Sequence, residues 1–187
     1  MSLIMGVLES DFVIFCADTQ LNGYDGIKSE VDKVYYINKD IIVATGGDYS
    51  LSHQTISLVT AHKNQENISF HEFYNAILQA FNEVSLSYSI LPNVTLLVAG
   101  KEQEQLLMNL LAIIDAQIIH EQYVYDGEPV RKILGQTHLH FNTLTNLFPK
   151  EKMTPATIIS KFQELLNKGI LVDETINNKM TYVIIRK

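Results

Sequence analysis

The sequence predicts an α+β fold, a four-layer αββα sandwich in which two antiparallel sheets pack between helix layers. Three observations support this prediction. Segments with strand-like alternation and β-branched residues fill the first fifty residues, and a second group occupies the middle of the chain. Two helical segments follow each group, and one more strand-like segment ends the sequence. Because strands and helices come in blocks instead of alternating, antiparallel sheets covered by helices are favoured over a parallel βα fold.

The first half of the chain is expected to contain four strands and two helices. The strands are expected near residues 3–9, 12–18, 33–37 and 40–45. The first helix is expected over residues 49–62. The second begins after Ser69, whose spacing to Glu72 is that of a capping box, and it carries apolar residues at helical spacing.

The second half repeats this order. Three strands joined by short turns are expected over residues 94–99, 106–114 and 118–125, with Asp126-Gly127 as a hairpin candidate. A third helix is expected after Gly135. The fourth begins at Thr154-Pro155, a capping residue followed by proline, and stops at Gly169. A strand over residues 180–185 closes the fold.

Length and composition limit the classes of function. With 187 residues, 47% of them hydrophobic, the chain is expected to form one domain over residues 1–187 with a sizeable core. The formal net charge of −7 argues against a phosphate-tracking surface, so nucleic acid is not expected as a partner. No signal-peptide pattern and no apolar stretch of about 18 residues is found, so we expect a cytoplasmic location and no membrane partner.

The side chains that often bind metals or act as nucleophiles give few signals. The single Cys16 lies inside an apolar strand and is expected to be a buried core residue, not a catalytic thiol. His138 and His140 have no recognisable third and fourth ligands near them, and no glycine-rich loop has the P-loop pattern. We therefore expect no metal and no other cofactor.

The first candidate site residue is Asp18, which ends the apolar run of residues 12–17. A carboxylate at the end of a buried strand loses its water and needs a partner or a function. Lys33 is the expected partner, because the residues between include Gly23 and Gly26, which suit a loop that folds back. On this observation alone, a structural salt bridge and a catalytic pair are equally open.

Short motifs in a fixed order resemble the proteasome β-subunit family of N-terminal-nucleophile hydrolases. In the first fifty residues they are Gly6-Val7, Ala17-Asp18-Thr19, Lys33-Val34 and Gly46-Gly47. Further on, the family's central Leu-Val-Ala-Gly strand, its Ile-Gly turn and its closing strand resemble residues 92–100, 133–135 and 182–187. The resemblance spans nearly the whole chain, although each motif alone is short.

The resemblance implies a set of catalytic residues. In this family the hydroxyl of the first residue of the mature chain attacks a carbonyl, and its own α-amine accepts the proton. By the family's spacing that residue is Ser2. Lys33 would lower the pKa of the amine, and Asp18 would hold Lys33 in place. A backbone N–H of Gly46 would point at the oxyanion, and Asp173 matches the acidic position that supports the amine from the other side.

The chain departs from the family pattern at two positions. Gln136 follows Gly135 where the family has a serine, and Ile176 occupies a second serine position. Both changes weaken the network that positions the amine. Met1 matters as well, because a retained methionine acylates the Ser2 nitrogen, and an amide nitrogen cannot act as a base.

Two hypotheses follow from the resemblance. In the first, the chain is a peptidase subunit that hydrolyses unfolded polypeptides or peptides, active only if Met1 is removed, and it forms a homo-oligomer, a ring or a dimer. In the second, it is a catalytically inactive subunit of the same fold with an assembly or interaction role. The second hypothesis accounts for Gln136, Ile176 and a retained Met1.

Overall fold

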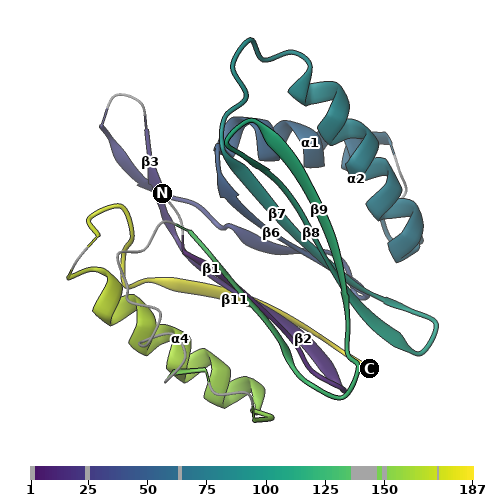
Figure 1. Cartoon of the computed structure of the whole chain (residues 1–187), viewed down its shortest axis with the longest axis vertical. Coiled ribbons are helices and arrows are strands. Elements are labelled where there is room, and N and C mark those ends of the chain that lie inside the picture. The colour runs from purple at the N-terminus through teal and green to yellow at the C-terminus, as the bar shows by residue number, and fades with distance from the viewer. Residues whose placement is uncertain (1–2, 24–25, 63–64, 136–146, 149–150, 172) are drawn as a thin grey trace.

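The computed structural model describes residues 3–23, 26–62, 65–135, 147–148, 151–171 and 173–187. The fold is an α+β, four-layer αββα sandwich, as the sequence predicts (Figure 1). Helices α1 (Tyr49–His62) and α2 (Phe70–Ser85) cover the outer face of one sheet. Helix α4 (Pro155–Gly169) covers the outer face of the other. Among the described residues, no helix has the length and apolar character needed to cross a bilayer.

The four-stranded sheet contains both the first and the last strand of the chain. In the order in which neighbours pair, its strands are β10 (Val130–Leu134), β1 (Ile4–Leu8), β2 (Phe12–Asp18) and β11 (Met180–Arg186). All of these pairings are antiparallel. Every residue of β1 and β2 is buried, because helix α4 covers one face of this sheet and the second sheet covers the other.

The five-stranded sheet follows chain order. Its strands are β5 (Val34–Asn38), β6 (Ile41–Gly47), β7 (Val94–Glu102), β8 (Gln105–Ile114) and β9 (Gln117–Val124). All of these pairings are antiparallel as well. A separate small hairpin pairs β3 (Gln20–Asn22) with β4 (Lys28–Glu30) directly after β2.

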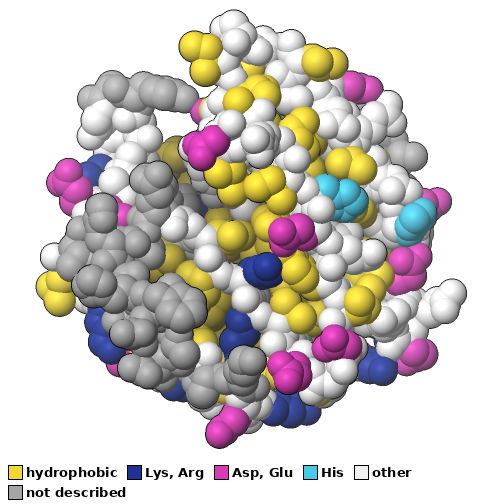
Figure 2. Space-filling model, in the orientation of Figure 1, with side chains coloured by type: hydrophobic (Ala, Val, Ile, Leu, Met, Phe, Trp, Pro, Cys, Tyr) yellow, Lys and Arg dark blue, Asp and Glu magenta, His cyan; other side chains and the backbone are white. Residues whose placement is uncertain are grey.

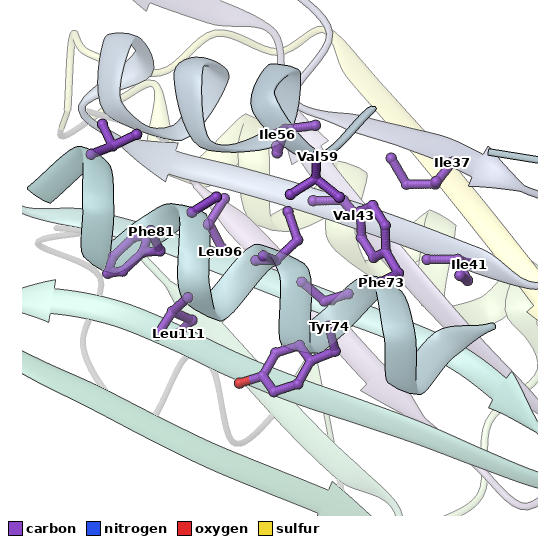
Figure 3. Packing of buried hydrophobic residues seen from close by; sticks show 14 of the residues in the cluster. Ile37, Ile41, Val43, Ile56, Val59, Phe73, Tyr74, Phe81, Leu96 and Leu111 are labelled. Carbon is purple, nitrogen blue, oxygen red and sulfur yellow. The ribbon is translucent and has the colours of Figure 1, made fainter. Parts of the chain in front are cut away.

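Three apolar layers hold the sandwich together. Helices α1 and α2 pack on the five-stranded sheet, where Phe73 and Phe81 of α2 lie over Val43 and Leu96 (Figure 3). A second layer fills the space between the sheets, and the third lies between the four-stranded sheet and α4. In the second layer the sheets meet closely at Gly6, where an added Cβ would lie 2.9 Å from the Met108 sulfur and 3.0 Å from a Leu97 methyl carbon. A side chain at residue 6 would therefore require these core side chains to shift.

Most predicted elements are present with shifts of a few residues at their ends. The capping box before α2 is confirmed, since the Ser69 hydroxyl accepts the Glu72 N–H and the Glu72 carboxylate accepts the Ser69 N–H. Thr154 caps α4 as predicted. The predicted third helix after Gly135 falls mostly outside the described residues.

One predicted turn is wrong. Asp126-Gly127 is not a hairpin, because β9 pairs with β8 and the next strand, β10, pairs with β1 in the other sheet. Gly127 has φ +112°, so the residue suits a tight turn, but the turn connects the two sheets. Helix α4 ends at Gly169, as predicted, and Ile170 after it keeps helical angles.

Candidate active site

The Asp18–Lys33 ion pair that the sequence predicts is present, and it is fully buried. Asp18 is the last residue of β2, and Lys33 lies immediately before β5. The Lys33 Nζ lies 3.0 Å from each oxygen of the Asp18 carboxylate and also donates to the Gln20 carbonyl. All three ammonium protons therefore have acceptors.

Backbone N–H groups complete the surroundings of the carboxylate. Leu3 donates to Asp18 Oδ1 at 2.8 Å, and Gln20 donates to Oδ2 at 3.1 Å. The Asp18 N–H in turn donates to the Leu3 carbonyl at 3.1 Å. Leu3 is thus fixed against Asp18 by two hydrogen bonds, and Leu3 directly follows Ser2 in the chain.

Burial shifts the pKa of each partner in the direction that favours its neutral form. It raises the pKa of the Asp18 carboxyl, while the charge of Lys33 and four hydrogen bonds act in the opposite direction. Burial likewise lowers the pKa of the Lys33 ammonium, against the attraction of Asp18. Burial thus acts against both charges, and each charge depends on the other.

Gly46 and Gly47 lie beside this pair, at the end of β6. The Thr45 N–H donates to the Lys33 carbonyl at 2.8 Å, so β6 reaches the lysine just before the two glycines. The sequence predicts a turn here. Instead, both glycines pair with β7 as the last two residues of β6. Gly47 has φ +79°, and an added Cβ would lie 2.3 Å from the Asn93 carbonyl oxygen, so only glycine fits.

Asp173 lies in a turn that is held against the end of β2. Its Oδ1 accepts the N–H of Thr175 at 2.8 Å and the hydroxyl of Thr175 as well. Two contacts tie this turn down: Asn177 Nδ2 donates to the Thr19 hydroxyl at 3.0 Å, and Gln20 Nε2 donates to the Glu174 carbonyl at 2.8 Å. The structure thus brings the Asp173 turn next to the residues that follow Asp18.

Sequence reasoning missed the hydroxyl beside Asp173. It noted Ile176 where a serine is expected, and in the structure Ile176 is a core residue, 4% exposed, in the layer beneath α4. The hydroxyl that bonds to Asp173 comes from Thr175 instead. The available signal was the spacing Asp-x-Thr, which favours a side-chain-to-backbone turn of this kind.

Two cavities adjoin this group on the side of the β3–β4 hairpin. One of about 10 Å³ is lined by Lys33, Thr45 and Gly46 among others. The other, of about 420 Å³, lies between Asn22 and Tyr49 and shares Gly47 with the first. Within the described parts of the chain, no three His, Cys, Asp or Glu side chains are grouped to hold a metal ion.

Some predicted site residues are not placed. Ser2 and Gln136 lie outside the described residues, as do His138 and His140. Of the five predicted catalytic residues, the structure brings Asp18, Lys33 and Gly46 together and places Asp173 in the neighbouring turn. Their catalytic roles stay predictions.

Comparison with known proteins identifies the family. The family model for the proteasome subunit matches residues 2–105, which is more than half of the chain. The chain belongs to the proteasome subunit family. A search of curated proteins found no match.

Solved structures show the same fold as this proteasome-family subunit. Anbu, the ancestral β-subunit, from Yersinia bercovieri aligns with a TM-score of 0.75 at 14% identity, over 98% of this chain and 81% of that one. The Anbu complex from Pseudomonas aeruginosa, a helical assembly, aligns with a TM-score of 0.73 at 14% identity, over 100% and 81%. HslV from Trypanosoma brucei aligns with a TM-score of 0.61 at 16% identity, over 99% of both chains.

Proposed function

We propose that this proteasome-family subunit is a peptidase that hydrolyses peptide bonds with the hydroxyl of Ser2, once Met1 has been removed. The observation that supports the proposal best is the Asp18–Lys33 pair. It is buried, every polar group in it is hydrogen-bonded, and one of its donors is the N–H of the residue that follows Ser2. Buried ion pairs contribute little net stability, so this one suggests a catalytic use.

The proposed reaction has two halves. The Ser2 Oγ attacks the carbonyl carbon of the substrate peptide bond, and the hydroxyl proton passes to the free Ser2 amine. The amine then gives that proton to the leaving nitrogen as the C–N bond breaks, which leaves an ester on Ser2. Water attacks the ester in the same way, with the amine again taking and returning a proton, and this step frees the second product and Ser2.

Lys33 and Gly46 would act on this reaction without changing covalently. An amine accepts a proton well near neutral pH only if its pKa is close to that pH, and a nearby cation lowers the pKa of an amine. Since all three Lys33 protons already have acceptors, we assign Lys33 an electrostatic role and not that of a proton carrier. The Gly46 N–H is the predicted donor to the oxyanion of the tetrahedral intermediate; because Gly46 pairs with Thr95 of β7, this N–H would have to leave or share its place in the β6–β7 ladder to do so.

A second candidate function has its own observations. Ile176 is a buried core residue where the family pattern has serine, and a retained Met1 would block the amine. Both favour a catalytically inactive subunit with an assembly or interaction role. Either function fits a homo-oligomer in the cytoplasm, and among the relatives of known structure one Anbu complex is a helical assembly.

Intact-mass measurement separates the two candidates. The purified protein is weighed and then incubated with a peptide epoxyketone, an electrophile directed at N-terminal nucleophiles. We expect loss of Met1 and one adduct on the N-terminal peptide. Ser2→Ala should abolish the adduct, and Ser10→Ala, which removes a hydroxyl in the turn between β1 and β2, should keep it. A retained Met1 with no adduct would rule out the peptidase and favour the inactive subunit.

A further inference from the structure

Strand β9 forms one edge of the five-stranded sheet, and its outer side is open. Among the described residues it pairs with β8 alone, over its whole length and without a shift in register. Most of its residues are exposed, including Ile118 at 48% and Val124 at 40%. Figure 2 shows hydrophobic side chains gathered over the part of the surface where β9 runs in Figure 1. A long, regular edge with exposed apolar side chains is a template for a further strand.

The turn before β9 determines which of its backbone groups point outward. Strands β8 and β9 are joined by Asp115 and Ala116, which both have positive φ, and Ile114 pairs with Gln117 across this turn. In a two-residue hairpin the flanking pair exchanges both backbone hydrogen bonds, and the next pair exchanges none. The N–H and C=O groups that point away from β8 therefore belong to every second residue, namely Ile118, His120, Gln122 and Val124.

The other three edges of the two large sheets are protected. The Tyr36 hydroxyl covers β11, because it accepts the Ile184 N–H at 3.0 Å and donates to the Ile184 carbonyl at 2.8 Å. Strand β5 has an irregular register between Tyr36 and Asn38. Strand β10 carries two basic side chains, Arg131 and Lys132. All of these features disfavour pairing with a further strand, whereas β9 contains no proline, lysine or arginine.

The side chains of β9 match those of a second copy of the same strand. When two copies pair antiparallel, the residues whose backbone groups point outward exchange hydrogen bonds with one another. The register that uses all four of them places Ile118 opposite Val124 of the second copy, and His120 opposite Gln122. Facing side chains of an antiparallel pair are in contact, so the two exposed apolar residues cover each other.

The other face of β9 fits this register as well. Ile119 lies opposite Tyr123 of the second copy, and Glu121 lies opposite its own counterpart at the centre. Two facing carboxylates repel each other, but each copy brings its own cation, since Lys132 Nζ lies 3.4 Å from Glu121 Oε2. Lys132 Nζ also lies 4.2 Å from the centre of the Tyr123 ring. The centre of the contact thus contains two ion pairs.

We infer that two copies of this chain associate through β9, paired antiparallel with Glu121 at the centre. The occupant is a second copy because the strand is complementary to itself in the register that makes the most hydrogen bonds. Such a contact uses the same surface on both copies and closes on itself, so it joins the two five-stranded sheets into one and defines a dimer. It involves neither Asp18 nor Lys33 and holds for either candidate function.

A disulfide between copies tests the register. Glu121 is opposite itself in a pair without hydrogen bonds, where facing Cα atoms are about 4.5 Å apart, within reach of a disulfide. Gln117→Cys is the matched control for Glu121→Cys: both side chains are exposed on the same face of β9, but the two copies of residue 117 would be about 25 Å apart. The full-length variants are oxidised under mild conditions and run on a non-reducing gel.

We expect Glu121→Cys to form a covalent dimer about tenfold faster than Gln117→Cys or more. The wild type should form none, because its single Cys16 is buried. Equal rates in the two variants would mean random collision and would overturn the inference. So would a monomeric wild type in sedimentation velocity together with no Glu121→Cys dimer, which would leave the edge to an extended segment of another protein.

A proline on the outer side of β9 tests the hydrogen bonds. Gln122→Pro removes an N–H that points away from β8, so the fold should persist while the contact is lost. Gln122→Ala removes the same side chain and keeps the N–H. By sedimentation velocity, the dissociation constant should rise about tenfold or more in Gln122→Pro and change less than about twofold in Gln122→Ala. Equal effects of the two variants would overturn the inference, and if circular dichroism shows that Gln122→Pro does not fold, the cross-linking rates decide.

Discussion

The β1–β2 hairpin carries a buried ion pair at each end, and the two pairs are built differently. At one end Lys33 Nζ lies 3.0 Å from both oxygens of Asp18, and backbone N–H groups complete the network. At the other end Arg131 Nη2 lies 3.7 Å from Glu9 Oε1. There, among the described residues, Glu9 Oε2 and Arg131 Nε have no hydrogen-bond partner.

The difference suggests different roles: the Asp18–Lys33 pair belongs to the candidate site, and the Glu9–Arg131 pair holds neighbouring segments together. The Glu9 carboxylate accepts the Met153 N–H at 3.3 Å, and Arg131 donates to the Glu151 carbonyl, so this pair ties the segment before α4 to β1 and β10. Its loose geometry is adequate for that purpose. A fully hydrogen-bonded buried network is rigid, and it fixes a cation at one point, as a catalytic group requires.

The largest loss of stability is expected when the Asp18–Lys33 pair, the tight pair, loses its cation. Lys33→Met leaves the Asp18 carboxylate buried without its cation, so the free energy of unfolding should fall by about 3 to 5 kcal/mol. Urea denaturation followed by circular dichroism measures the loss. The double variant Asp18→Asn/Lys33→Met should lose less than the sum of the two single variants. Additive losses would mean that the two groups are not coupled.

A smaller loss of stability is expected when the Glu9–Arg131 pair, the loose pair, loses its cation. Arg131→Met removes the cation from Glu9, but that cation is only 3.7 Å from Glu9 Oε1 to begin with, and Glu9 keeps the Met153 N–H. We expect a loss of about 1 to 3 kcal/mol, the cost of leaving a buried polar group unsatisfied. The same urea titration measures it. A loss as large as that of Lys33→Met would remove the distinction between the two ends.

Glu9 should also give the protein a characteristic pH dependence. Burial raises its pKa above the ordinary 4.5, so the folded state holds this proton more tightly than the unfolded state. The stability of the wild type relative to Glu9→Gln should therefore fall as the pH rises from about 4.5 through the higher folded pKa. Urea titrations at several pH values measure the difference.

Asp11 provides a control of opposite sign. The hydrogen bond from Lys152 lowers the pKa of Asp11 below its ordinary value of 3.8. The wild type should thus lose stability relative to Asp11→Asn as the pH falls below that value. If both variants showed the same sign, burial would not be what shifts Glu9.

The sequence predicts most of the fold, because it is built from long, regular patterns. The strands that it misses lack such patterns: β3 and β4 have three residues each, and every residue of β10 is half-buried, so none of them shows a clear alternation. The Asp126-Gly127 turn was wrong for another reason. Turn chemistry is local, and it does not say to which sheet the next strand belongs.

The candidate site is predictable where it depends on buried charge. Asp18 ends an apolar strand, so the sequence predicts a buried carboxylate that needs a cation as its partner. The other contacts depend on backbone N–H groups and on loop geometry, which no sequence pattern predicts. One is the Leu3 N–H that donates to Asp18, and another is the Thr175 hydroxyl that donates to Asp173 in place of the missing serine. The Gly47 conformation is also set by a distant partner, Asn93.

The smallest effect is expected at Cys16, which lies between the two ends of the hairpin on the side of β2 that faces α4. Burial raises the pKa of its thiol to about 12, so at pH 8 the folded protein should react very slowly with a disulfide reagent such as DTNB, and only through opening. Because Arg131 holds the segment before α4, Arg131→Met should speed this reaction more than its loss of global stability explains. Lys33→Met acts at the opposite end, and its effect should follow global stability alone. If Lys33→Met instead speeds the Cys16 reaction further beyond its loss of global stability than Arg131→Met does, the local opening lies at the Asp18–Lys33 end of the hairpin, and that end is the less rigid of the two.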